Sequence, residues 1–128
     1  MNQKELIRIA KKMREKAYAP FSKYTVGASV ETENGSIVDG CNVESASYGL
    51  TCCAERVALY KAVSQGFSKF KAMAVASENG GFPCGACRQV IWELCGDIPI
   101  LIIDNENKIG ETSSRTLLPD AFDKDKLI

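Results

Sequence analysis

Hydrophobic and polar positions follow two different periods along the chain and divide it into three helical and five extended segments. Near the N-terminus, Leu6, Ala10 and Met13 recur at helical spacing and predict a helix with one apolar face. Helices are predicted over residues 3–17, 51–65 and 84–95. Alternation and short apolar runs predict strands over residues 24–30, 37–43, 70–76, 98–103 and 108–112.

Turn and cap residues mark several of these boundaries. Thr51 is the predicted N-cap of the second helix, and Gly66 and Gly96 are predicted to end the second and third helices. Asn34-Gly35 favours a hairpin between the first two strands. The order of elements predicts one α/β domain over residues 1–128, with helices on the faces of a central sheet. The second and third helices both follow strands, so their N-termini are expected at one end of the sheet.

Composition and charge narrow the classes of function. A chain of 128 residues with 45% hydrophobic residues can build one core without cross-links. Sixteen basic residues balance sixteen acidic ones, which argues against a nucleic-acid partner. No segment approaches the roughly 20 apolar residues of a membrane span, so no membrane partner is expected. The N-terminus lacks the apolar stretch of a signal peptide, and a cytoplasmic protein with reduced thiols is expected.

The chain has six cysteines and no histidine, and this limits the kinds of catalytic and metal site that it can form. In a chain with a sufficient core, clustered cysteines favour metal binding or catalysis over a disulfide framework. Without histidine, the Ser-His-Asp and Cys-His arrangements and every histidine-ligated zinc site are excluded. Acid–base catalysis must therefore depend on Glu, Asp, Lys, Tyr or Cys.

Two cysteine clusters stand where helices are predicted to begin. Cys84 and Cys87 form a C-x-x-C pair, which places both sulfurs on one side of the first helical turn. Such a pair can be part of a zinc site, can be a redox-active dithiol, or can be a coincidence of spacing. Cys52 or Cys53 could add a third thiolate, with the carboxylate of Glu55 beside it. Three thiolates leave the fourth tetrahedral position open, as in a catalytic zinc site, although a structural four-cysteine site is also possible. Spacing alone does not choose between Cys52 and Cys53.

These residues carry a resemblance to a known family. Cys53-Ala54-Glu55 followed by Pro83-Cys84-Gly85-Ala86-Cys87 resembles the signature of the zinc-dependent nucleoside and nucleotide deaminases, in the three-cysteine form of the short cytidine deaminases. The likeness continues through residues 20–28, 40–46 and 87–90, and it spans about residues 6–122. It implies a three-layer α/β/α fold with a central mixed five-stranded sheet.

The resemblance also implies roles at the metal. Cys53, Cys84 and Cys87 are expected to bind one Zn²⁺ per subunit, and Arg56 to hydrogen-bond the ligand sulfurs. Zinc is expected to activate water for attack on C4 of cytosine. Glu55 is expected to move protons to N3 and then to the leaving amino group. The less favoured alternative for Arg56 is a surface salt bridge.

Substrate contacts are implied in the same way. The expected substrates are cytidine and 2′-deoxycytidine, which become uridine and 2′-deoxyuridine in pyrimidine salvage. Asn42 and Glu44 match the positions that hold the ribose hydroxyls, Tyr24 replaces the usual Phe against the pyrimidine ring, and Ala54 is a further expected contact. Without the resemblance, Asn42 and Glu44 would be taken as a turn at the end of a strand.

The short members of the family are homotetramers with shared active sites, which implies the same assembly here. Tyr48 and Phe122 resemble the residues donated to a neighbouring subunit, although each is more simply a core aromatic. The cysteines given no role are predicted to be small core hydrophobes: Cys41, Cys52 and Cys95. Two alternatives remain: a deaminase of another cytosine-bearing molecule, such as blasticidin S, and a non-catalytic zinc module. Glu55 argues against the module, and Asn42-Val43-Glu44 argues against the blasticidin type.

Overall fold

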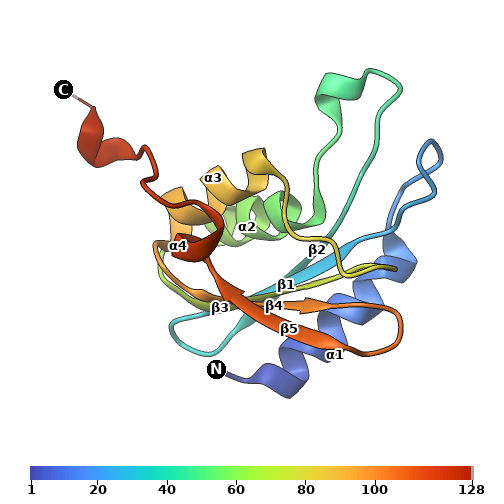
Figure 1. The fold of residues 1–128 in the computed structure, drawn as a ribbon, viewed down its shortest axis with the longest axis horizontal. Coiled ribbons are helices and arrows are strands. Elements are labelled where there is room, and N and C mark those ends of the chain that lie inside the picture. The colour runs from blue at the N-terminus through green and yellow to red at the C-terminus, as the bar shows by residue number, and fades with distance from the viewer. Residues whose placement is uncertain (128) are drawn as a thin grey trace.

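The computed structural model describes residues 1–127 and shows a five-stranded sheet between two layers of helices (Figure 1). The strand order is β2-β1-β3-β4-β5. Only β3 and β4 are parallel, whereas the other neighbours are antiparallel. The strands are β1 (Gly27–Thr32), β2 (Ile37–Cys41), β3 (Phe70–Ala76), β4 (Pro99–Ile103) and β5 (Ile109–Ser113). The predicted mixed sheet within a three-layer fold is thereby confirmed.

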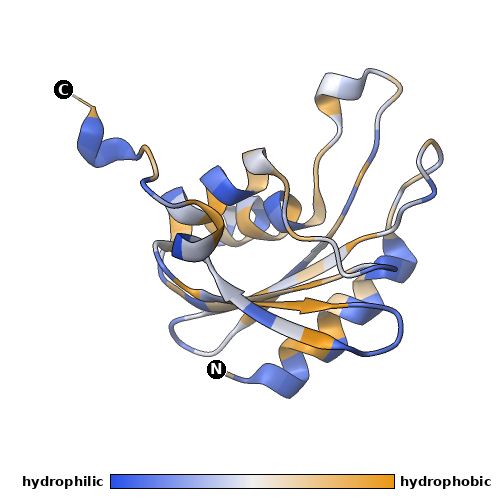
Figure 2. Cartoon of the chain, in the orientation of Figure 1, coloured by the Kyte–Doolittle hydropathy of each residue, from blue (hydrophilic) through white to orange (hydrophobic). Residues whose placement is uncertain are grey.

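One face of the sheet is covered by α1 (Gln3–Met13), which continues as a 3-10 turn over Arg14–Lys16 (Figure 1). The side of α1 that meets the sheet is hydrophobic, and the opposite side is polar (Figure 2). Its buried side chains form a small core with strands β3 and β4, made of Leu6, Ala10, Ala72, Ala74, Ala76, Leu101 and Ile103. The alanines on β3 keep this layer thin, so the helix backbone lies close to the sheet.

The other face carries α2 (Ala54–Ser64), α3 (Gly85–Cys95) and the short α4 (Ser114–Leu117). Here the core is larger and includes Ala58, Leu59, Met73, Ile91 and Ile100, all of them essentially buried. Helix α3 crosses from β3 to β4, which is the connection that two parallel strands require. Among residues 1–127, no helix combines the length and apolar character of a membrane span.

Two elements begin three residues later than predicted, and the first helix and second strand end earlier, at Met13 and Cys41 instead of residues 17 and 43. Helix α2 begins at Ala54 with Cys53 as its N-cap, not at Thr51, because Cys52 forms a two-hydrogen-bond bridge with Val43 and stays extended. Strand β1 begins at Gly27 instead of residue 24. The side chain of Asn42 bonds Tyr24 O and Val26 N, and among the described residues the only backbone bond from the segment after β2 to residues 24–26 is from Asn42 N to Val26 O.

The cysteines outside the metal motifs were predicted as core residues, and this is correct only in part. Cys95 packs against the larger core, and burial raises the pKa of its thiol to about 12. Cys41 and Cys52 are only half-buried and belong to neither core cluster.

Three segments extend away from the sheet (Figure 1). Residues 18–26 and residues 42–53 form two loops on the same side, and the second carries a 3-10 turn, Tyr48–Leu50. The third segment is the tail after α4, which ends in a 3-10 turn over Lys124–Lys126. The tail is attached to α3 by side-chain hydrogen bonds from Gln89 and Trp92.

Candidate metal centre and substrate pocket

Two helix N-termini bring three cysteine sulfurs together. Cys53 is the N-cap of α2, Cys84 is the N-cap of α3, and Cys87 lies in the first turn of α3. The three Sγ atoms all lie within 4.8 Å of one another, and Cys53 Sγ is 3.8 Å from Cys84 Sγ. Free N–H groups and the positive end of each helix dipole favour thiolates at these positions.

The sulfur positions fit a tetrahedral zinc ion. Zn–S bonds of about 2.3 Å at tetrahedral angles separate two sulfurs by about 3.8 Å, which matches the distance between Cys53 and Cys84. A disulfide would need a separation of about 2.05 Å, and all six cysteines are free. Cys52, whose backbone pairs with Val43, is not part of the cluster. The geometry therefore resolves which of the two adjacent cysteines faces the cluster.

Arg56 supplies positive charge to the sulfurs from the first turn of α2. The Nη2 atom of its guanidinium group donates a hydrogen bond to Cys53 Sγ at 3.5 Å. The alternative prediction, that Arg56 forms a surface salt bridge, is wrong, because no carboxylate among residues 1–127 pairs with it. Hydrogen bonds from Cys87, Arg56 and Cys84 lower the pKa of the Cys53 thiol against the opposing effect of burial. The pKa of Cys87 is raised, because its S–H donates to Cys53 and is itself buried.

One polar atom at this centre has no partner. Nε of Arg56 is the only buried side-chain nitrogen or oxygen in the described part of the chain that makes no hydrogen bond. A buried donor without an acceptor costs about 1–3 kcal/mol. Arg56 Nε lies next to the sulfur cluster. This fits a metal site, because all three sulfurs are negatively charged thiolates only when a metal is bound.

Glu55 is a buried carboxylate on the same helical turn. It is 4% exposed, and burial raises its pKa to about 7. No purely structural role is evident for it, because a buried carboxylate is costly unless it is paired. A carboxyl group with a pKa near neutrality can both accept and release a proton.

Glu55, Cys53 and Cys84 line a common pocket of about 270 Å³. This volume is close to the lower end of the roughly 300–1,000 Å³ range of small-molecule sites. Among the predicted contacts, Tyr24, Asn42, Glu44 and Ala54 also line it. The sequence did not indicate several further wall residues: Ser22, Val26, Thr51, Val75, Ser77, Gly81 and Phe82.

The polar residues at the mouth are already bonded within the chain. Asn42 donates from Nδ2 to the Tyr24 carbonyl at 2.8 Å and accepts from Val26 N at 2.9 Å. The Glu44 carboxylate accepts from Phe21 N, Ser22 N and Ser22 Oγ. The hydroxyl of Ser22 contributes most to a lowered pKa of Glu44, which keeps this carboxylate ionised.

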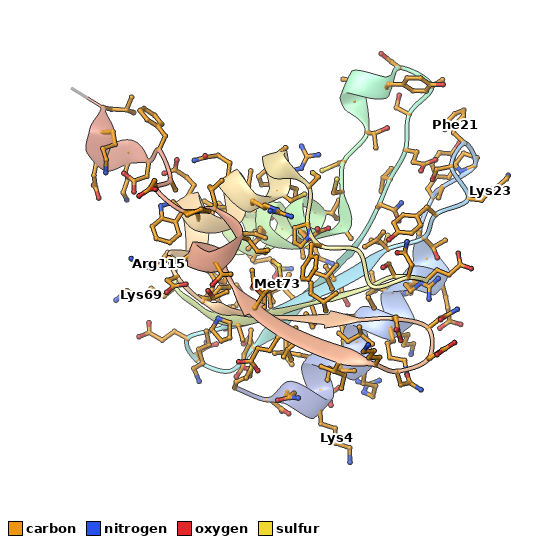
Figure 3. The ribbon with its side chains drawn as sticks, viewed as in Figure 1. Lys4, Phe21, Lys23, Lys69, Met73 and Arg115 are labelled. Carbon is orange, nitrogen blue, oxygen red and sulfur yellow. The ribbon has the colours of Figure 1, made fainter. Side chains whose placement is uncertain are left out.

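Tyr48 and Phe122 lie outside this pocket. Tyr48 is 81% exposed and Phe122 is 59% exposed, so neither is a core aromatic. Figure 3 shows a third aromatic, Phe21, at the tip of the 18–26 loop beside Lys23 and far from Met73 in the sheet. Tyr48 and Phe21 line a second hollow next to the mouth of the pocket.

A three-sulfur cluster at two helix N-termini, with a buried carboxylate in the same pocket, defines a zinc-type deaminase. The comparisons agree. The family model described as the cytidine and deoxycytidylate deaminase zinc-binding region matches residues 1–102. A protein named cytidine deaminase from Sporosarcina psychrophila is 48% identical over 130 residues, which cover 99% of this chain and 96% of the relative.

A solved structure supports the same conclusion. The crystal structure of cytidine deaminase from Burkholderia pseudomallei has a TM-score of 0.90 at 47% identity, covering 95% of this chain and 100% of that one. A more distant relative, named blasticidin-S deaminase from Bacillus cereus, is 30% identical over 90% of this chain and 88% of its own length. The chain therefore belongs to the cytidine and deoxycytidylate deaminase family, and the resemblance found in its sequence is confirmed.

Proposed function

We propose that the protein hydrolyses the amino group of cytidine and 2′-deoxycytidine, giving uridine or 2′-deoxyuridine and ammonia, as a step of pyrimidine salvage. The observation that carries this proposal is Glu55, a buried carboxylate in a small pocket that also contains two sulfurs of the cluster. A purely structural zinc site has no use for such a group. The relatives named cytidine deaminase support the choice of substrate.

Cys53, Cys84 and Cys87 are the proposed ligands of one Zn²⁺ per subunit, because their separations fit thiolate coordination. Zinc held in this way supplies an activated water at neutral pH. Arg56 offsets part of the negative charge of the three thiolates by its hydrogen bond to Cys53.

Glu55 is the proposed proton carrier. It takes a proton from the attacking water and delivers it to N3 of the cytosine ring, which makes C4 more electrophilic. Once the water oxygen has bonded to C4, Glu55 takes the remaining proton of that oxygen and delivers it to the amino nitrogen. The C4–N bond then breaks, ammonia leaves, and the oxygen becomes the C4 carbonyl of the product. One carboxylate can do both because its pKa lies near neutrality. Ala54, fully buried beside it, forms part of the wall against which the base lies.

Asn42 and Glu44 are the proposed ribose contacts. A carboxylate has about four acceptor positions, and the chain itself occupies three of those of Glu44. The amide of Asn42 likewise retains one donor hydrogen after it binds the Tyr24 carbonyl. Each side chain is therefore held in place by the chain and keeps capacity for a ribose hydroxyl. An ionised Glu44 also disfavours a phosphate on that hydroxyl.

The proposed assembly is a homotetramer with shared active sites, in which Tyr48 and Phe122 reach a neighbouring subunit. Their exposure supports this, because both side chains lie on segments that project from the sheet and are accessible to a neighbouring subunit. We infer a single catalytic domain over residues 1–128 that acts in the cytoplasm on small nucleosides, with no nucleic-acid or membrane partner.

Ammonia release tests the proposal. Zinc-loaded native protein should release ammonia from cytidine and 2′-deoxycytidine but not from cytidine 3′-phosphate. Glu55→Gln should lower kcat by about 10³-fold or more while keeping its zinc, and Glu93→Gln, at an exposed site on α3, should change nothing. Activity on blasticidin S alone would support the other deaminase class. Bound zinc without ammonia release from any of these compounds would identify a structural module.

A further inference from the structure

Tyr24 stands where the family usually has Phe, and its extra hydroxyl makes a specific bond. Tyr24 Oη donates to Asn79 Oδ1 at 2.6 Å, across 55 residues of sequence. Asn79 belongs to the loop between β3 and α3, which leads directly into Pro83-Cys84. The bond therefore joins two walls of the pocket, one before β1 and one next to the sulfur cluster.

Gly81 lies against the same hydroxyl. A Cβ at this position would lie 2.8 Å from Tyr24 Oη, 3.6 Å from Asn79 Oδ1 and 4.0 Å from Tyr24 Cζ. The first distance is too short for a normal contact, whereas the other two are ordinary van der Waals separations. A side chain at position 81 would therefore have to displace the Tyr24 hydroxyl, whereas the ring atoms themselves leave room for it.

The backbone of Tyr24 is fixed independently of this contact. Its carbonyl accepts from Asn42, and its N–H donates to Ser22 Oγ. Ser22 is in turn held by Glu44, and Lys23 adopts a left-handed backbone conformation with φ of 61°. With the main chain held on both sides, the position of the ring depends on what its hydroxyl end touches.

We propose that Asn79 and the open space at Gly81 set the position of the Tyr24 ring in the pocket and so determine substrate affinity. This inference rests on the proposed function. Asn79 and Gly81 are positioning residues, because they act through Tyr24: Asn79 does not line the pocket, and Gly81, which does, has no side chain to contact the substrate. Both affect binding of the nucleoside, and neither affects the proton transfers.

Steady-state kinetics on the zinc-loaded full-length chain test the inference. Tyr24→Phe and Asn79→Ala should each raise KM for cytidine about threefold with kcat unchanged, the size expected for one partly exposed hydrogen bond. The double variant should be no worse than either single one, because both remove the same bond. Tyr60→Phe is the control, since its hydroxyl bonds nothing within residues 1–127.

Gly81→Ala provides the sharper test. It should raise KM about tenfold, because the new methyl group displaces the Tyr24 hydroxyl and tilts the ring. In the Tyr24→Phe background the same substitution should cost nothing further, since the clashing oxygen is gone. Zinc content and Tm should be equal in all four proteins. An equal KM penalty in both backgrounds, or a loss of Tm without a change in KM, would overturn the inference.

Binding separates this inference from the proposed function. Calorimetric titration with uridine, the expected product, should show the same affinity pattern without turnover. A native protein that neither converts cytidine nor binds uridine overturns the proposed function and the inference together. A native enzyme that converts cytidine, with an unchanged KM in Gly81→Ala, overturns the inference alone.

Discussion

On one face of the sheet, helix α1 begins with Asn2, whose side chain accepts a hydrogen bond from Glu5 N. On the other face, α2 and α3 begin with Cys53 and Cys84, which make no capping bond to their helices. All three helices have 11 residues and pack on the same sheet. The caps differ because the sulfurs of α2 and α3 face each other, so their helix ends are reserved for a metal rather than satisfied by a side chain.

The difference has an energetic meaning. A good N-cap contributes about 1 kcal/mol, so two helices without one are less stable in the metal-free protein. Metal binding offsets this loss, because negative sulfurs at the positive end of a helix dipole are favourable. One face of the sheet is thus optimised for stability alone, whereas the other sacrifices some stability for chemistry.

The largest effect, on zinc affinity, is expected when the N-cap cysteine of α3 is replaced by serine, a residue that caps helices by hydrogen bonding. Cys84→Ser should reduce zinc affinity by more than about 100-fold. Removal of a residue that only hydrogen-bonds a metal ligand costs up to about 100-fold, and Cys84 is itself a proposed ligand. Without metal the same variant should be about 0.5–1 kcal/mol more stable, because serine is a favoured N-cap and position 84 has the extended backbone of one. Competition with a zinc chelator and urea unfolding in EDTA measure the two quantities.

Cys95→Ser is the matched control for this variant. Cys95 ends α3 and packs against the core, so its substitution should lower stability and leave zinc binding intact. If Cys84→Ser destabilised the metal-free protein, the distinction between the two kinds of helix start would be wrong.

The next largest effect is expected from substitution of two glycines, one beneath a helix on each face of the sheet. A Cβ at Gly27 would lie 2.0 Å from the Ala10 carbonyl oxygen of α1, and one at Gly40 would lie 2.5 Å from Ala58 N of α2. Both alanine variants should lose about 3 kcal/mol, since only movement of a helix relieves either clash. Gly40→Ala should also weaken zinc binding, because the displaced helix begins at Cys53, whereas Gly27→Ala should keep full zinc content.

Chemical denaturation and metal analysis of the two variants provide this comparison. Gly110→Ala is the control, because a Cβ at that strand position meets nothing within 4 Å among residues 1–127. Loss of zinc in Gly27→Ala would show that the two faces are not independent, and full zinc affinity in Gly40→Ala would show that the position of α2 does not control the sulfur cluster.

The same contrast explains which features were predictable from the sequence. Helix α1 packs mainly by hydrophobic burial, so the spacing of Leu6, Ala10 and Met13 reveals it directly. The bounds of helices α2 and α3 were predicted from the N-cap candidate Thr51 and the glycine stops Gly66 and Gly96. The start of α2 was misplaced at Thr51, because the pairing of Val43 with Cys52 joins segments whose contact no local pattern records.

The pocket shows the same limit. Cys84, Cys87 and Glu55 belong to compact motifs whose residue types and spacing nominated them, and the family resemblance selected Cys53 over Cys52. The contact between Tyr24 and Asn79 spans 55 residues and depends on the course of two loops. The signal in the sequence that could have pointed to this contact is a run of turn-forming residues, Asn79-Gly80-Gly81, which was not used in the prediction.

A smaller effect is expected from the charge behind the sulfurs. Arg56→Ala should keep the fold but weaken zinc binding by about 10- to 100-fold, because three thiolates then lose a charged donor. Arg8→Ala is the matched substitution on the α1 face, where Arg8 pairs with Glu5 on the surface and should contribute little. Chelator competition compares the two variants, and native zinc affinity in Arg56→Ala would rule out its proposed role.

The smallest effect concerns the structural cap on α1. Asn2→Ala should reduce stability by about 1 kcal/mol and leave zinc affinity and KM unchanged, since only the side-chain bond to Glu5 N is lost. The backbone N–H of residue 2, which donates to Glu31 Oε1 at 2.7 Å, remains in the variant. Asn2→Ser should restore stability, because serine caps as well as asparagine. Thermal melting of the three proteins measures the difference. If serine did not restore stability, the contribution of Asn2 would not come from its N-cap hydrogen bond. The N-terminus of α1 would then be no better capped than those of α2 and α3, and the contrast between the two faces would fail.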